Sequence, residues 1–177
     1  MSKEMMVRRQ FVYCPYCATA LEEREVYRQR RPVCPACGFV HFQDPKVAVI
    51  AFVTHKERVL LVQRAIDPGK GQWALPGGYM DADEMPEAAL QRELLEEVNL
   101  AIQIDRLLTI FPIVTAPGRG QGIVLAYQAT PADAKATKLT CDDDVSAADW
   151  FTADRVPANL AFESTHVLLA HWREQLN

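Results

Sequence analysis

Three glutamates and one arginine lie within six residues near the middle of the chain: Arg92, Glu93, Glu96 and Glu97. On a helix, residues three and four apart share a face, so the three carboxylates would project together. Grouped carboxylates repel one another, and one arginine cannot neutralise them all. Oxygen ligands of this kind suit a small divalent cation such as Mg²⁺. A solvated acidic helix face is the alternative interpretation.

The residues around this cluster favour the metal site. Gly77 and Gly78 allow a tight turn before it, and Pro86 suits the first turn of a helix, where a missing N–H has no cost. An apolar stripe recurs every fourth residue at Leu90, Leu94 and Val98. The stripe predicts a helix that packs on a core and presents its carboxylates on another face.

From Gly78 to Leu100 the spacing resembles the Nudix box, over 23 contiguous positions that include every charged position of that motif. The resemblance implies that Glu93 and Glu97 are the principal ligands of Mg²⁺ or Mn²⁺. In the same pattern Glu96 would support these two ligands, and the Gly77 carbonyl oxygen would be a further ligand.

Two further charged residues have roles in the resembled motif. Arg92 would hold the carboxylates in register through a charge-assisted fork, and Glu84 would steady this network or bind the metal through water. The motif usually has Gly where this chain has Asn99. Because Asn tolerates the left-handed conformation that ends many helices, we expect Asn99 to keep that turn.

Four of the five cysteines form two CxxC pairs, Cys14 with Cys17 and Cys34 with Cys37. This separation predicts a four-thiolate zinc site, because each short turn presents two sulfurs to one tetrahedral ion. Disulfides and a redox pair are the alternatives. A reducing compartment disfavours disulfides. A redox motif needs only one CxxC pair, whereas this chain has two. The segment resembles a zinc ribbon of two short hairpins.

The role of the ribbon is a separate question. A segment of this size buries little apolar surface, so the metal would hold it together. A basic run comprises Arg24, Arg28, Arg30 and Arg31. This run allows a patch for phosphate or nucleic acid, but scaffolding is favoured. Tyr13, Tyr16 and Phe39 are predicted to pack around the cysteines rather than to stack on bases.

The length and the charge of the chain limit which architectures and binding partners are possible. The chain of 177 residues suits one domain with a small module, and we predict a ribbon over 1–42 and a Nudix domain over 43–177. The net charge is −4, and the larger part is acidic, so nucleic acid is not expected as a partner. No apolar run is long enough to span a membrane, and the first residues lack the features of a signal peptide. We therefore expect the protein to be located in the cytoplasm.

The elements that position the site follow from apolar patterning. Residues 47–53 predict a buried strand, with a hairpin return over 59–62. Residues 102–114 and 122–129 predict two more strands, and residues 160–176 a closing amphipathic helix. The Nudix resemblance implies the α+β class, an α/β/α sandwich with a mixed sheet between helices.

Two residues outside the box are candidates for the site. Arg119 lies in the loop of residues 115–121 and is a candidate contact for a substrate phosphate, although an exposed loop arginine is usually solvated. Asp144 precedes an aromatic pair, and related enzymes often place an acidic residue there. It is a candidate additional metal ligand, base or substrate contact, with a solvated turn as the alternative.

The order of motifs is similar to that of the plant chloroplast FAD pyrophosphatase and its bacterial relatives, whereas the SQPWPFP-type signature of NADH pyrophosphatases is absent. The resemblance implies hydrolysis of the pyrophosphate bond in a nucleoside diphosphate linked to X, with ADP-ribose, FAD or NADH as substrate types. The products would be a nucleoside monophosphate and phosphorylated X. A non-catalytic regulator that uses its ribbon on nucleic acid or protein is one alternative, and an RNA-end or housecleaning pyrophosphohydrolase is another. Relatives of this kind are often homodimers.

Overall fold

The apolar run predicted as a buried strand forms β3 (Lys46–His55), and the chain returns antiparallel along β4 (Arg58–Arg64). Lys56 and Glu57 make the turn with φ of 46° and 59°, a twist that suits two-residue hairpins. The structure is a computed structural model that describes residues 11–113, 122–135, 138–142 and 144–176. Arg119 lies outside these described residues.

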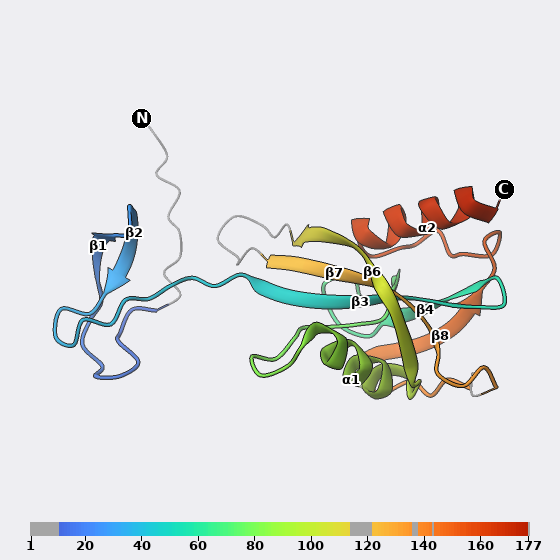
Figure 1. Cartoon of the computed structure of the whole chain (residues 1–177), viewed down its shortest axis with the longest axis horizontal. Helices are drawn as coiled ribbons and strands as arrows, with labels where there is room; N and C mark the ends of the chain where they lie inside the picture. Colours follow the sequence, from blue (N-terminus) through green and yellow to red (C-terminus); the bar gives the residue numbers. More distant parts are fainter. Residues whose placement is uncertain (1–10, 114–121, 136–137, 143, 177) are drawn as a thin grey trace. The chain divides into compact units, whose positions relative to one another are not determined.

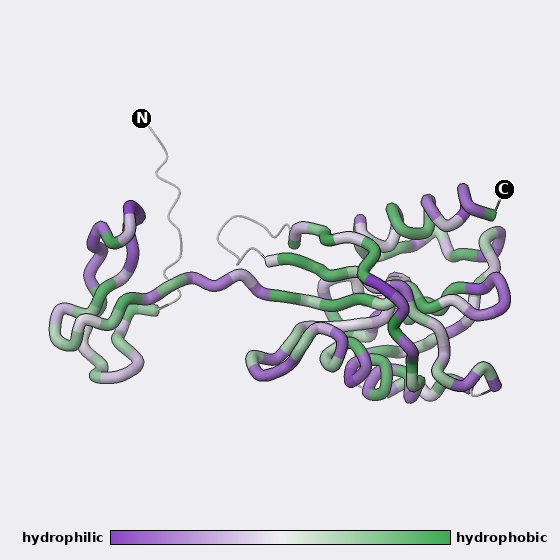
Figure 2. The backbone as a smooth tube through the Cα atoms, in the orientation of Figure 1, coloured by the Kyte–Doolittle hydropathy of each residue, from purple (hydrophilic) through white to green (hydrophobic). Residues whose placement is uncertain are grey.

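Within the described chain, β3 and β4 belong to a six-stranded mixed sheet with the order β5–β4–β3–β7–β6, and β8 pairs with β4. The other strands are β5 (Trp73–Ala74), β6 (Ile102–Ile113), β7 (Gly122–Pro131) and β8 (Val145–Phe151). Strands β3 and β7 are parallel, and the other pairs are antiparallel. Figure 2 shows β3 and β7 as largely hydrophobic, as expected for strands with both faces covered. The predictions of β6 and β7 are confirmed, whereas β8 was not predicted.

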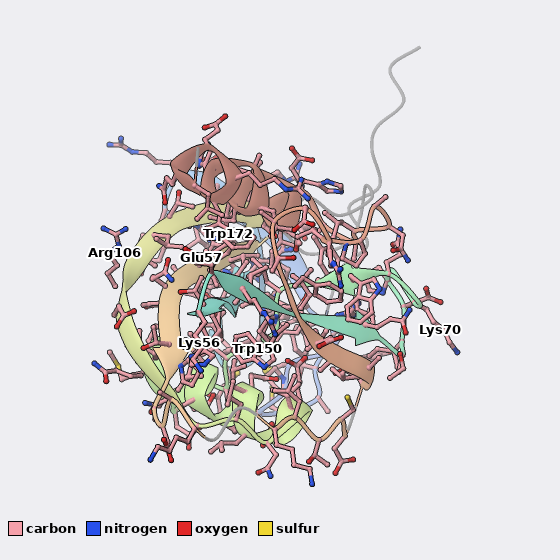
Figure 3. The ribbon with its side chains drawn as sticks, turned by 90° about the vertical axis from the view of Figure 1, so that its right-hand side faces the viewer. Lys56, Glu57, Lys70, Arg106, Trp150 and Trp172 are labelled. Atoms are coloured by element: carbon pink, nitrogen blue, oxygen red, sulfur yellow. The ribbon has the colours of Figure 1, made fainter. Side chains whose placement is uncertain are left out.

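Helices α1 (Pro86–Val98) and α2 (Glu163–Leu176) cover opposite faces of this sheet (Figure 1). Successive residues of a strand face opposite sides, so Val49 and Val53 pack with α1 whereas Phe52 packs with α2. Figure 3 shows Trp172 between α2 and the sheet and Trp150 on the α1 side. The predicted α/β/α sandwich is confirmed. Neither described helix has the length and apolar character needed to cross a membrane.

Helix α1 is held by the predicted apolar stripe, because Leu90, Leu94 and Val98 are all fully buried. The helix ends at Val98, and its C-cap, Asn99, has φ 53° and ψ 42°. Its N–H donates to Leu95 O at 3.0 Å, so a carbonyl of the last turn is satisfied. The prediction that Asn99 keeps the left-handed turn is therefore confirmed.

Residues 11–45 belong to a compact unit separate from the one that holds the mixed sheet. Strands β1 (Glu22–Val26) and β2 (Gln29–Val33) form an antiparallel hairpin. Single bridges, Tyr13 with Ala20 and Val33 with Val40, close the two cysteine-bearing turns. The predicted boundary between residues 42 and 43 stays a prediction.

The prediction for the aromatic residues of this unit is wrong in part. Phe39 packs against the small core of Cys14, Leu21 and Cys34, and Tyr16 contacts the Phe39 ring edge-on although it is exposed. Tyr13 is exposed as well. This core is so small that the ring of Phe39 is enough to cover it, so the two tyrosine rings have no buried apolar site to occupy.

Candidate active site and cysteine centre

The glycine turn lies beside β3. Val49 N–H donates to Gly78 O at 2.8 Å, and Ala51 N–H donates to Pro76 O at 2.9 Å. Gly77 lies between them with φ 136°, and a Cβ there would be 2.1 Å from Val49 O, so no side chain fits. Among the described residues, no N–H donates to the Gly77 carbonyl. This carbonyl is therefore available as a ligand.

Glu97 connects α1 to the glycine turn. Its Oε2 accepts a hydrogen bond from Gly77 N–H at 2.9 Å, and the residue is only 3% exposed. Burial raises the pKa of Glu97 to about 8, although the Gly77 N–H opposes the shift. The negative charges of Asp144 and Glu93 contribute to this raised pKa. A carboxylate in this position needs positive charge to ionise at neutral pH.

Glu93 lies one helical turn earlier and touches the same loop. A Cβ on Gly78 would be 2.5 Å from its carboxylate, so the glycine makes room for this group. Burial raises the pKa of Glu93 as well, and the charges of Glu96 and Asp144 add to the shift, whereas Arg92 opposes it. Glu93, Glu97 and Asp144 therefore act on one another, as three neighbouring carboxylates do.

Asp144 reaches the cluster because its segment crosses the end of α1. Thr140 N–H donates to Val98 O and Asp142 N–H to Glu97 O, both at 3.1 Å. Ala65 N–H, just after β4, donates to Asp144 O at 2.6 Å. These bonds fix the segment between the C-terminus of α1 and the end of β4. The structure thus brings this predicted site residue together with those of the helix.

Arg92 organises the more exposed carboxylates. Its Nε and Nη2 donate to the two oxygens of Glu84 at 2.6 and 2.9 Å. Its Nη1 donates to Glu93 and to Glu96, both at 2.9 Å. The bidentate pairing with Arg92 lowers the pKa of Glu84 to about 2. Glu84 and Glu96 are therefore bound to the arginine, whereas Glu97 has no ion-pair partner among the described residues.

Two cations, one acting on Glu97 and one beside Tyr79 after the glycine turn, were not predicted as site residues. The charge of Arg64, at the end of β4, lowers the pKa of Glu97. Its Nε donates to Pro68 O at 2.7 Å, and its guanidinium lies over the Phe162 ring. Lys46, at the start of β3, places Nζ 4.8 Å from the centroid of the Tyr79 ring. Single basic residues at strand ends carry no spacing pattern, so the sequence offered no signal for them.

The donor set of the cluster is of the chemical kind that divalent cations prefer, although in the described part of the chain only the cysteines bring three or more side-chain ligand atoms within 4.8 Å of one another. It consists of the Glu93, Glu97 and Asp144 carboxylates and the Gly77 carbonyl, all of them oxygen donors. Hard cations such as Mg²⁺ and Mn²⁺ prefer these ligands. Burial is the main reason that the pKa values of Glu93 and Glu97 are raised, and the charges of the neighbouring carboxylates add to it.

A separate groove of about 400 Å³ lies between α2 and strands β6 and β7. Phe52, Arg106, Gln128 and Trp172 are among its lining residues. None of the predicted site residues lines it. The carboxylate cluster is on the other face of the sheet, with α1.

The four paired cysteines lie together in the N-terminal unit, with all Sγ atoms within 4.8 Å of one another. Cys17 and Cys34 are 3.4 Å apart, and Cys14 and Cys37 are 3.6 Å apart. Tetrahedral zinc with Zn–S bonds of about 2.3 Å separates its sulfurs by about 3.8 Å. Ala18 and Gly38 follow the two pairs with φ of 56° and 77°. The centre is compatible with a small zinc site.

Comparison with known proteins matches residues 44–171 to the NUDIX domain. The ADP-ribose pyrophosphatase of Methanocaldococcus jannaschii is 30% identical over 132 residues, which are 75% of this chain and 76% of that protein. The NAD-capped RNA hydrolase NudC of Stutzerimonas stutzeri is 26% identical over 156 residues, 86% of this chain and 52% of that protein. A crystal structure of a NUDIX hydrolase from Nitrosomonas europaea aligns with a TM-score of 0.82 at 26% identity, covering 94% of this chain and 93% of that one.

Proposed function

Because the chain belongs to the NUDIX family, whose members hydrolyse phosphoanhydride bonds, we propose that it cleaves the pyrophosphate of a nucleoside diphosphate linked to another moiety. ADP-ribose, FAD and NADH are the substrate types, and the products are a nucleoside monophosphate and a phosphorylated second moiety. The observation that carries this proposal is the buried Glu97 carboxylate bound to Gly77 N–H. A non-catalytic fold has no need for a buried acidic group of this kind.

The cluster supports specific roles. Glu93, Glu97 and the Gly77 carbonyl would hold Mg²⁺ or Mn²⁺, with Glu96 in support. Such a cation offsets the charge of the pyrophosphate and makes water a better nucleophile. Arg92 fixes Glu93 and Glu96 by direct hydrogen bonds. Both oxygens of Glu84 are taken by Arg92, which favours a steadying role for Glu84.

Asp144 is the remaining carboxylate of the cluster. Its charge raises the pKa of both Glu93 and Glu97, so it lies close enough to act on these two groups. We assign it as an additional ligand or as the base that takes a proton from water. The substrate contact proposed for Arg119 stays a prediction, because that residue lies outside the described chain.

ADP-ribose is the first substrate to test, because the relative from M. jannaschii carries that name at 30% identity. NAD-capped RNA is the second candidate. The alignment with NudC covers 86% of this chain, more than the Nudix domain alone can supply, so it extends into the N-terminal unit. FAD is supported by the order of the motifs in the sequence.

A product assay tests the proposal. Purified protein is incubated with ADP-ribose, FAD, NADH, NAD-capped RNA and deoxynucleoside triphosphates, with Mg²⁺ or with Mn²⁺. We expect AMP and ribose 5-phosphate from ADP-ribose, and no turnover when a chelator removes the cation. Binding of a nucleotide without turnover of any substrate, under either metal, would establish the regulator instead.

Other assignments are proposals of the same kind. Four cysteine sulfurs within 4.8 Å support one structural zinc ion in a ribbon over 1–42, ahead of a Nudix domain over 43–177. The cytoplasmic location and the homodimer stay predictions. The mass of the protein in solution, with and without substrate, tests the second.

A further inference from the structure

The N-terminal unit exposes two stacked aromatic rings, one at the turn of its hairpin and one in the segment after the second cysteine pair. Tyr27 and Phe42 have ring centroids 6.2 Å apart and planes inclined by 25°. Tyr27 is 76% exposed and Phe42 is 47% exposed. Neither ring belongs to the core of Cys14, Leu21 and Cys34, so packing inside the ribbon does not explain them.

The turn between β1 and β2 does not explain Tyr27 either. Tyr27 and Arg28 form this turn with φ of 51° and 62°. Two-residue turns of this type favour Asn and Gly, because a bulky side chain is disfavoured at positive φ. The backbone thus holds an aromatic ring at the tip of the hairpin at some cost to the fold.

Arginines gather beside the two rings. Arg24 and Arg31 are directly opposite each other across the hairpin, and like charges in this arrangement repel. The Arg31 guanidinium lies 5.1 Å over the Phe42 ring. It is held there by hydrogen bonds to Val26 O and to Gln29 Oε1.

Acidic residues of the hairpin are mostly on its other side. Opposed residues share a face and successive residues alternate, so Glu23 and Glu25 lie on the face away from Arg24 and Arg31. Glu22 shares the arginine face and pairs with Arg24 at 2.9 Å. The arginine face, with Arg28 at the turn, is therefore net positive.

We infer that this arginine–aromatic surface, made of Arg24, Tyr27, Arg28, Arg31 and Phe42, binds single-stranded nucleic acid. Exposed rings and guanidinium planes stack on unpaired bases, and arginines pair with the phosphates between them. A strand that carries both groups matches the surface better than a duplex, whose bases are already stacked. A phosphate between Arg24 and Arg31 would also relieve their repulsion.

The inference departs from the expectation drawn from composition. The basic run of the ribbon allowed a patch for phosphate or nucleic acid, but the acidic net charge disfavoured it and the scaffolding role was favoured over it. What changes the assignment is the segregation of charge between the two faces of the hairpin, together with the exposure of Tyr27 and Phe42. The inference does not depend on the carboxylate cluster.

Fluorescence anisotropy of the full zinc-loaded chain with a labelled short single-stranded RNA tests the inference. DNA of the same sequence and the corresponding duplex serve as further probes. We expect the single strands to bind more tightly than the duplex, and binding to weaken as salt rises. Equal affinity for the duplex, or no binding at low salt, would overturn the inference.

Two variants on this surface have matched controls. Tyr27→Asn suits the turn conformation, and we expect it to weaken binding by at least about fivefold through lost stacking. Tyr16→Asn is the control, because Tyr16 is also exposed but contacts Phe39 instead. Arg31→Ala should weaken binding, whereas Arg30→Ala, which changes the opposite face, should have a small effect.

Further measurements separate the alternatives. Zinc content and ADP-ribose turnover should be unchanged in Tyr27→Asn, so that a loss of RNA binding is not a loss of folding. Equal losses from Arg30→Ala and Arg31→Ala would indicate nonspecific charge and contradict the inference. If Tyr27→Asn changes the mass of the protein in solution but not its RNA affinity, the surface is a contact between copies of the chain.

Discussion

The backbone N–H of Gly77 donates to Oε2 of Glu97 at 2.9 Å, across twenty residues of sequence. This bond connects the turn beside β3 to the last turn of α1. A side chain at Gly77 would collide with Val49 O, and Glu97 is almost completely buried. The relative position of loop and helix is therefore closely determined, and it places the glycine turn beside the carboxylates of Glu93 and Glu97.

Replacement of Glu97 by glutamine should lower kcat by at least about a hundredfold, because electrostatic stabilisation of the transition state is lost. The amide has nearly the same shape and its oxygen can still accept the Gly77 N–H, so the melting temperature should change little. Glu87→Gln is the matched control on the same helix, since Glu87 contacts Tyr127 rather than the cluster. An unchanged rate at saturating Mg²⁺ would remove Glu97 from the mechanism.

The stability of the metal-free protein should depend on pH through Glu97. Its pKa in the folded state is about 8, against an ordinary value of 4.5. The fold therefore favours the protonated carboxyl, and this contribution is complete below the ordinary value and is lost as pH rises through about 8. In a chelator the melting temperature should fall as the pH rises from about 4.5 to about 8, and this group should add no further slope above that.

Cation binding should reverse this trend, because it favours the ionised carboxylate. The increase in melting temperature caused by Mg²⁺ should thus grow over the same pH range. Melting curves of wild type and Glu97→Gln, with Mg²⁺ and with chelator, measure both effects. The same pH slope in the glutamine variant would assign the effect to another group.

The two glycines should respond differently to alanine. In Gly77→Ala the new Cβ would meet the Val49 backbone at 2.1 Å with φ at 136°, so we expect a loss of at least about 2 kcal/mol in the free energy of unfolding. In Gly78→Ala the Cβ would meet the movable carboxylate of Glu93. Activity should fall there with a smaller loss of stability. Urea denaturation together with ADP-ribose turnover distinguishes the two, and equal stability losses would contradict this account.

Asp144→Asn should reduce turnover and lower the pKa of Glu97, because a negative charge that raises that pKa is removed. Asp142→Asn is the control, since Asp142 is exposed and contacts α1 through its backbone N–H. The pH dependence of kcat/KM for both variants is the measurement. If Asp144→Asn behaves as wild type, the segment is a solvated turn.

The purified chain should contain about one tightly bound zinc ion, as expected for a four-thiolate site. Cys34→Ser should lose this zinc and unfold the ribbon, because the buried Cys34 also belongs to the core of that unit. Cys141→Ser should keep it, since Cys141 is not part of the cluster. Metal analysis after gel filtration measures the stoichiometry, and a chain without zinc would contradict the assignment.

Local relationships were open to prediction from the sequence. The burial of Leu90, Leu94 and Val98 and the left-handed turn at Asn99 depend on the periodicity and end of one helix. The same holds for the two sulfurs of each CxxC pair, which local backbone geometry brings together, whereas the two pairs meet across 17 and 23 residues of sequence. These features depend on residues a few positions apart, so spacing alone is sufficient evidence.

Relationships across the fold were decided by tertiary structure. Asp144 meets Glu97 because its segment hydrogen-bonds to the end of α1, and Arg64 approaches because β4 ends there. The exposure of Tyr16 and Tyr27 depends on how little core the ribbon has. The sequence by itself determined which side chains could act together on one helix or one turn. Only the packing of distant segments decided which further charged groups and aromatic rings lie near those side chains, because distances between residues far apart in sequence depend on how the whole chain folds.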